Sequence, residues 1–153
     1  MADAALPPPF EAYSGPLPYA FVSYAHRDAG EVFPEIARLH AQGYRLWYDE
    51  GIDPGNEWPE EIGRALAGCS FFIVFITPNA VGSQNVRNEI NFALNKCKPF
   101  LAIHLVDTPL PHGLELRMGD IQAVLKYRMT PDGYCRKVEK VLPADILSSD
   151  VPA

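Results

Sequence analysis

The sequence predicts an α/β protein of three layers, in which a parallel sheet of five strands in the order 2-1-3-4-5 carries helices on both faces. Strand-type and helical segments alternate along the chain, which is typical of βαβ units. The run at residues 71–76 is hydrophobic throughout, as expected of a central strand that is covered on both faces. The length of 153 residues fits a single domain with a substantial core. Together these features indicate a flavodoxin-like arrangement.

Five short segments rich in β-branched and aromatic residues are expected to form the strands. They cover residues 19–23, 44–48, 71–76, 100–106 and 123–127. The last has the weakest pattern, so we expect it at an edge of the sheet.

Four helices are expected from hydrophobic periodicity. The first begins at Asp28, where Glu31 would complete a capping box, and Gly43 ends it. The second has Trp58 as its cap residue, because Pro59 suits the first helical position. After a turn at 77–79, the remaining two cover residues 83–94 and 130–142, and residues 114–120 form a short irregular or helical turn.

The two ends of the chain show little periodic pattern. Residues 1–18 include five prolines, three of them consecutive, and are expected to be a disordered or extended lead-in. The domain is expected over residues 19–142, with residues 143–153 as a tail or linker.

Composition narrows the range of partners. The net charge is −6 and basic residues are not clustered, which argues against nucleic acid and anionic membrane surfaces. No hydrophobic run approaches the ~18 residues of a membrane span, and no secretory signal is visible. The three cysteines lack paired spacing and are expected to be reduced thiols in the cytoplasm. The histidines are scattered, so no metal site is predicted.

The predicted strand order places a ligand crevice beyond the carboxyl ends of the first and third strands. The loops that would line it are residues 24–28 and 77–83, with the long loop 49–58 beside them. Because long loops in compact domains are often functional, the 49–58 loop is itself a candidate site.

Glu89 is the candidate for chemistry at this crevice. In its helix the hydrophobic positions fall within roughly one quadrant, and Glu89 lies about 40° outside it. A carboxylate at that margin can be partly desolvated and still reach a cleft. Periodicity alone favours the ordinary alternative, a solvated helix residue.

Five pieces of the sequence, in order, resemble the Toll/interleukin-1 receptor (TIR) domain, and most closely its bacterial members. They are Phe21-Val-Ser-Tyr24, Trp47-Tyr-Asp49, Gly51-Ile-Asp-Pro-Gly55 leading to Trp58, Phe75-Ile-Thr-Pro78, and Ser83 followed by Glu89-Ile90. The resemblance covers about four fifths of the chain, from residue 19 to residue 142.

The resemblance implies a function of one of two kinds. Many TIR domains cleave NAD⁺ between nicotinamide and ribose, releasing ADP-ribose or cyclic isomers; their essential glutamate corresponds to Glu89. NAD⁺ is then the substrate, and no separate cofactor is implied. Such bacterial domains are signalling or defence effectors that act on self-association and are fused to, or partnered with, a sensor module. Other TIR domains are non-catalytic modules that assemble with each other, and this is the alternative.

The resemblance also assigns roles to other residues. Gly51, Ile52, Asp53, Pro54 and Gly55 correspond to the assembly loop, and a substrate-binding role falls to Tyr24, Ala25, His26, Arg27, Trp47, Asp49, Trp58, Ser83 and Asn85. His26 and Arg27 would meet a diphosphate, or would simply be exposed loop residues. Trp58 would stack on a nicotinamide or adenine ring of the substrate, or would form a hydrophobic staple between the loop and the helix. Asn85 and Ala25 depart from the enzymatic pattern, which often has tryptophan and a basic residue there, and they favour the non-catalytic alternative.

Two other classes with related topology lack the residues they need. A response-regulator receiver requires an acidic pair after the first strand and an aspartate at the end of the third. The sequence has Ser23-Tyr24 and Ile76-Thr77 in those places. A dinucleotide-binding Rossmann domain requires a glycine-rich first turn, and residues 24–28 contain no glycine.

Overall fold

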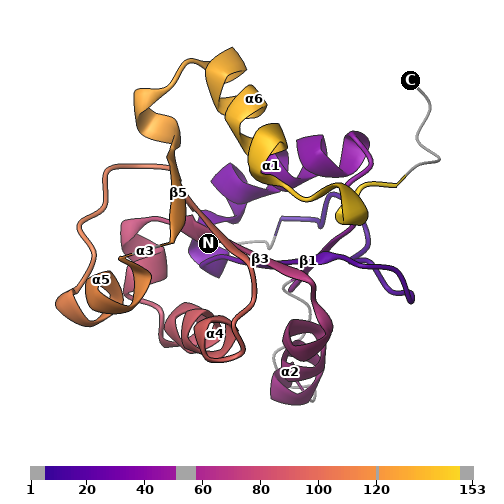
Figure 1. The fold of residues 1–153 in the computed structure, drawn as a ribbon, viewed down its shortest axis with the longest axis horizontal. Coiled ribbons are helices and arrows are strands. Elements are labelled where there is room, and N and C mark those ends of the chain that lie inside the picture. Colours follow the sequence, from indigo (N-terminus) through magenta and orange to yellow (C-terminus); the bar gives the residue numbers. More distant parts are fainter. Residues whose placement is uncertain (1–5, 51–57, 120, 149–153) are drawn as a thin grey trace.

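The computed structural model describes residues 6–50, 58–119 and 121–148. Its centre is a parallel sheet in the order β2-β1-β3-β4-β5 (Figure 1). The strands are β1 (Ala20–Ser23), β2 (Leu46–Tyr48), β3 (Phe71–Ile76), β4 (Phe100–His104) and β5 (Gln122–Leu125). This confirms the predicted fold class, the strand order and the edge position of the fifth strand.

Helices cover both faces of the sheet (Figure 1). One face carries α1 (Ala29–Ala41) and α6 (Pro131–Val141), and the other carries α2 (Trp58–Gly68), α3 (Pro78–Val81), α4 (Gln84–Asn95) and α5 (His112–Met118). Short 3₁₀ helices are η1 (His26–Asp28), η2 (Lys126–Arg128) and η3 (Ala144–Ile146). The described parts of the chain therefore form the expected three layers.

The core is divided by β3 into two hydrophobic clusters. Ile73 and Phe75 point toward α1 and α6, whereas Phe72 and Val74 point toward α2 and α4. Because side chains alternate along a strand, a strand covered on both sides must be hydrophobic throughout, and all six residues of β3 are buried.

Side-chain caps set the beginnings of the helices that follow β3. The Thr77 hydroxyl accepts a hydrogen bond from the Ala80 backbone N–H at 3.0 Å, which starts α3 where the sequence predicted only a turn. The Ser83 hydroxyl accepts one from the Val86 N–H at 3.2 Å and starts α4. Such caps satisfy N–H groups that have no partner within the helix.

The segments outside the predicted domain also pack against it. In the lead-in, the Phe10 ring stacks on His40 at 4.0 Å, and the Tyr13 N–H bonds to the Leu46 carbonyl at 2.9 Å. In the predicted tail, Ile146 is fully buried and its carbonyl accepts from the Arg45 N–H at 2.8 Å. Isolated hydrophobic residues between prolines and polar residues give no periodic signal, so the sequence pattern missed these contacts.

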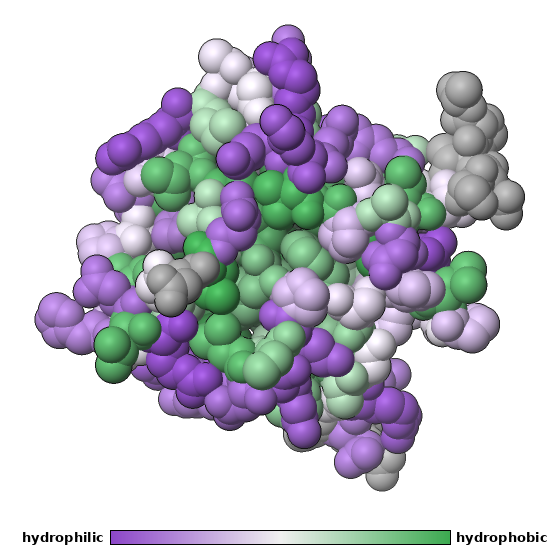
Figure 2. Space-filling model, in the orientation of Figure 1, coloured by the Kyte–Doolittle hydropathy of each residue, from purple (hydrophilic) through white to green (hydrophobic). Residues whose placement is uncertain are grey.

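The surface carries both hydrophilic and hydrophobic residues. In the view of Figure 2, hydrophilic residues cover the outer helices, and hydrophobic residues gather toward the centre. Exposed hydrophobic side chains include Leu116 on α5, which is 85% exposed. None of the helices in the described ranges is long and hydrophobic enough to cross a membrane.

Candidate functional site

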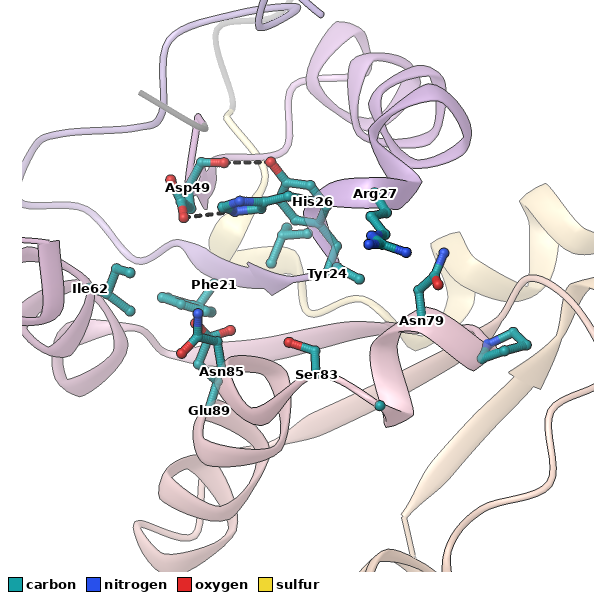
Figure 3. Close-up of a pocket in the computed structure, with 14 residues that line it drawn as sticks. Phe21, Tyr24, His26, Arg27, Asp49, Ile62, Asn79, Ser83, Asn85 and Glu89 are labelled. Atoms are coloured by element: carbon teal, nitrogen blue, oxygen red, sulfur yellow. Dashed lines mark hydrogen bonds and ion pairs between the residues drawn. The ribbon is translucent and has the colours of Figure 1, made fainter. Parts of the chain in front are cut away.

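A cavity of about 410 Å³ lies beyond the carboxyl ends of β1, β2 and β3, between η1, α2, α3 and α4 (Figure 3). It occupies the crevice that this strand order was expected to form. Eight predicted site residues line it: Tyr24, Ala25, His26, Arg27, Asp49, Ser83, Asn85 and Glu89. Pro78, Asn79 and Gly82 also line it and belong to the loop 77–83 that was expected there, whereas Phe21, Val22 and Ile62 were not predicted.

Glu89 lies on α4 with its carboxylate partly buried at the cavity wall. The Ser23 hydroxyl, at the end of β1, donates a hydrogen bond to Glu89 Oε1 at 2.6 Å. Burial raises the pKa of Glu89 to about 7, an effect opposed by the Ser23 hydrogen bond, strengthened by Asp49 and opposed again by His26. At neutral pH this side chain therefore exchanges between carboxylate and carboxylic acid, as is common for groups in active sites.

Across the cavity from Glu89, His26 and Asp49 form an ion pair (Figure 3). His26 Nε2 lies 2.8 Å from Asp49 Oδ2, and the side chains are 50% and 15% exposed. The hydrogen bond to Asp49 raises the pKa of His26 in spite of partial burial. His26 therefore carries positive charge to higher pH than an ordinary histidine.

Tyr24 fixes the backbone beside this pair. Its hydroxyl donates to the Asp49 carbonyl at 2.5 Å, and burial, followed by the charge of Asp49, raises its pKa above the ordinary tyrosine value. Tyr24 thus remains a neutral donor and ties the loop after β1 to the end of β2.

A buried network holds the other wall of the cavity. Asp28 accepts hydrogen bonds from the Thr77 hydroxyl and, at 2.8 Å, from the Asn79 side-chain amide. The predicted capping box is wrong on this point, because Asp28 makes no side-chain cap to α1. Its carboxylate instead joins η1 to α3, which neighbouring residues in the sequence could not reveal.

Arg27 and Asn79 lie together at the end of the cavity away from Phe21 and Ile62 (Figure 3). Arg27 is exposed, and Asn79 is held by Asp28. One end of the cavity is therefore polar and basic, and the other presents hydrophobic side chains.

Among the predicted site residues whose side chains the structure describes, Trp47 lies outside the cavity. Its ring stacks on Phe21 at 5.0 Å and supports the hydrophobic end from behind. Trp58 is the first residue of α2, whereas the sequence predicted it as the cap residue before the helix. The predicted assembly loop, Gly51 to Gly55, lies outside the described residues.

The sequence pattern missed three of the cavity residues, Phe21, Val22 and Ile62. Phe21 and Val22 belong to a hydrophobic strand and Ile62 to a hydrophobic helix face, so each was interpreted as core. Pro78, Asn79 and Gly82 lie in the loop 77–83, which was expected at the crevice. What the sequence did not predict there is the short helix α3, which contains Pro78 and Asn79 and is followed by Gly82.

Within the described ranges, no group of three or more His, Cys, Asp or Glu side chains is arranged to hold a metal ion. The described residues that line the cavity supply the Glu89 carboxylate, the His26–Asp49 ion pair, Arg27 and neutral donors.

A family model of the TIR domain matches residues 20–139, and the chain therefore belongs to the TIR domain family. A solved structure with the same fold is the TIR domain of the Toll-related receptor TRR-2 from Hydra magnipapillata, with a TM-score of 0.63 and 16% sequence identity. The match covers 80% of this chain and 96% of that chain. No curated protein gives a significant match.

Proposed function

We propose that this TIR domain is an NAD⁺ glycohydrolase in which Glu89 is the catalytic residue. The observation that supports this most directly is the Glu89 carboxylate, partly buried at the crevice wall and held by the Ser23 hydroxyl at 2.6 Å. The resemblance to NAD⁺-cleaving members assigns the essential glutamate to the same residue. The substrate is NAD⁺, and the reaction requires no further cofactor.

The reaction breaks the bond between C1′ of the ribose and the nicotinamide nitrogen. The electron pair leaves with nicotinamide, which departs as a neutral molecule, so no general acid is needed. The ribose develops oxocarbenium character, and a nearby carboxylate stabilises this positive charge. Water then bonds to C1′ and loses a proton to solvent, giving ADP-ribose; attack by a group of the substrate itself would give a cyclic isomer.

The shape and charge of the cavity fit this substrate class. Its volume of about 410 Å³ lies within the usual range for small-molecule sites. Ile62 is partly exposed and, with the buried Phe21 beside it, offers a hydrophobic surface for a nicotinamide ring. His26 and Arg27 supply positive charge for the diphosphate.

Activity is proposed to depend on association with other TIR domains, since members of this family interact homotypically. The chain would then act as a cytoplasmic effector domain of bacterial signalling or defence, controlled by a fused or partner sensor module. The loop at residues 51–55 is the proposed contact region.

Nicotinamide release from NAD⁺ by concentrated, crowded protein tests the proposal. Wild type is expected to release nicotinamide, and Glu89→Gln, which preserves size but removes the charge, is expected to lose at least ~100-fold of that rate. Glu115→Gln is the matched control, because it makes the same change on the exposed surface of α5. Equal rates for wild type and Glu89→Gln, or no release by wild type in the assembled state, would contradict the proposal.

Asn85 supports the alternative, a non-catalytic interaction module. It lines the cavity, but it is exposed and offers an amide where many enzymatic relatives have a ring. Replacement by tryptophan distinguishes the two functions: Asn85→Trp should raise nicotinamide release by an enzyme and leave a non-catalytic module inactive.

A further inference from the structure

Residues 10–13, here called the strap, run along the outer side of β2. The Tyr13 N–H bonds to the Leu46 carbonyl at 2.9 Å, and the Phe10 ring is stacked on His40 of α1. Phe10 and Ala12 also pack against the larger core cluster. The strap is therefore anchored to both the edge strand and the helix beside it.

The strap contacts the two residues on either side of Asp49. The hydroxyl of Tyr48 donates to the Phe10 carbonyl and accepts from the Phe10 N–H at 3.4 Å. The Ala12 N–H donates to Glu50 Oε2 at 2.6 Å. Tyr48 is fully buried, so its hydroxyl depends on the strap for these partners.

Asp49 itself faces the other way, into the candidate site. Its carboxylate pairs with His26 at 2.8 Å, and its carbonyl accepts from Tyr24 at 2.5 Å. Within the part of the chain that the structure describes, the charged groups acting on His26 are Asp49, at hydrogen-bond distance, and Glu89 across the cavity. The backbone between Tyr48 and Glu50 is thus held from outside by the strap and from inside by the site.

We propose that the strap is a positioning element for the candidate site: by fixing Tyr48 and Glu50 it holds Asp49 against His26. The part of this proposal that concerns catalysis rests on the proposed NAD⁺ cleavage, whereas the part that concerns the His26–Asp49 pair does not. Displacement of the strap would release Asp49 and weaken the site without altering any residue that lines the cavity. The strap would then provide a route by which events at the N-terminal segment regulate the domain.

Hydroxyl deletions in the full chain test the proposal. Tyr48→Phe removes both hydrogen bonds to Phe10 and keeps the buried ring. Tyr13→Phe is the matched control, since within the described ranges its hydroxyl accepts only from the Leu17 N–H, at 3.1 Å, and Tyr13 lies at the far end of the strap. Phe10→Ala is a second disruptive variant, and melting curves identify any variant that fails to fold.

The first readouts are hydrogen exchange at residues 46–50 and the pKa of His26 by NMR. Tyr48→Phe and Phe10→Ala are expected to speed exchange there at least about fivefold and to bring the pKa of His26 down toward the ordinary value, whereas Tyr13→Phe leaves both as in wild type. Unchanged exchange and an unchanged His26 pKa in both disruptive variants would overturn the proposal, whether or not the protein cleaves NAD⁺.

The second readout is nicotinamide release in the wild-type and Asp49→Asn backgrounds. If the strap acts through Asp49, Tyr48→Phe lowers the rate several-fold in the first background and adds no further loss in the second. Equal losses in both backgrounds would overturn this route. Failure of every variant, including wild type, to release nicotinamide would instead contradict the proposed function, and the NMR and exchange results would still decide the role of the strap.

Discussion

The Ser23 hydroxyl donates a 2.6 Å hydrogen bond to Oε1 of Glu89, and so joins the end of β1 to α4 at the wall of the cavity. This bond stabilises the charged form of Glu89 and opposes the rise in its pKa that burial causes. The strand that ends at the crevice therefore favours the ionised form of the residue proposed to do the chemistry.

Ser23→Ala is expected to raise the pKa of Glu89 above its present value of about 7, because the carboxylate loses its donor. The Glu89 carboxyl group is then ionised in a smaller fraction of the molecules at neutral pH. The proposed activity therefore falls at pH 7 and recovers as the pH is raised. An NMR titration of the glutamate carboxyl groups measures the shift. Ser70→Ala is the control, as the Ser70 hydroxyl bonds to the Tyr19 carbonyl outside the cavity; a Glu89 titration identical to wild type would rule out the role of Ser23.

Glu89→Gln is expected to stabilise the fold at neutral and alkaline pH. The pKa of Glu89 is about 7 in the folded state against an ordinary value of 4.5, so ionisation is less favourable in the folded than in the unfolded chain. Wild type therefore loses stability between about pH 4.5 and pH 7, and the variant does not. Denaturant unfolding should give the variant an advantage of about 1–3 kcal/mol at pH 8 and none at pH 4. A constant difference across this range would show that the carboxylate is not desolvated.

Asp49→Asn is expected to lower the pKa of His26 toward the ordinary value of 6.5, because the hydrogen bond to Asp49 is the largest cause of its rise. A histidine whose pKa is higher in the folded state stabilises the fold below its unfolded pKa, and that contribution is lost as the pH rises through the folded pKa. The difference in stability between wild type and variant should therefore be larger at pH 6 than at pH 9, and below about 1 kcal/mol because His26 is half exposed. Two-dimensional NMR of the histidine ring provides the pKa, and an unshifted titration would contradict the pairing.

Asp28→Asn is expected to destabilise the fold by about 1–3 kcal/mol, because an amide cannot accept from both Thr77 and Asn79 without turning its own donor toward one of them. The cavity wall formed by α3 should loosen at the same time. Chemical denaturation compares this variant with Asp132→Asn, the same change at an exposed position of α6. Equal effects of the two substitutions would show that the buried network contributes little.

Glu35→Ala is expected to cost about 3 kcal/mol of stability. Glu35 is buried on the face opposite α4 and accepts from Tyr134 at 2.8 Å and Lys126 at 2.5 Å. Its removal leaves these donors and Arg38 without their shared acceptor. Since this cluster lies outside the cavity, the pKa of His26 should stay unchanged while the unfolding midpoint falls; a change in His26 would reveal coupling between the two faces.

The layers of the fold could be predicted because they depend on patterns that are local in sequence. The unbroken hydrophobic run at residues 71–76 became β3 with identical bounds. Gly43 ends the first helix as expected, with a positive φ of 104° that suits glycine. Thr130 caps α6 through a 3.1 Å bond to the Gly133 N–H.

The site was only half predictable, because its geometry depends on pairs that are distant in sequence. Ser23 and Glu89 are separated by 66 positions, and Asp28 and Asn79 by 51. Periodicity could place Glu89 at the margin of a buried stripe, but nothing in the local sequence gave it Ser23 as a partner. For the same reason Asp28 was predicted to be a helix cap, although its partners are Thr77 and Asn79, which follow β3.

The convergence of both terminal segments on β2 has a consequence for association. An edge strand with unpaired backbone groups is a template on which another chain can add a strand. Here Leu46 is bonded to Tyr13, Arg45 is bonded to Ile146, and the Arg45 side chain also binds the carbonyls of Pro18 and Asp145. Because those backbone positions are already occupied, copies of this domain should not add a strand at the β2 edge. A version trimmed to residues 19–142 would instead expose a bare sheet edge and should aggregate.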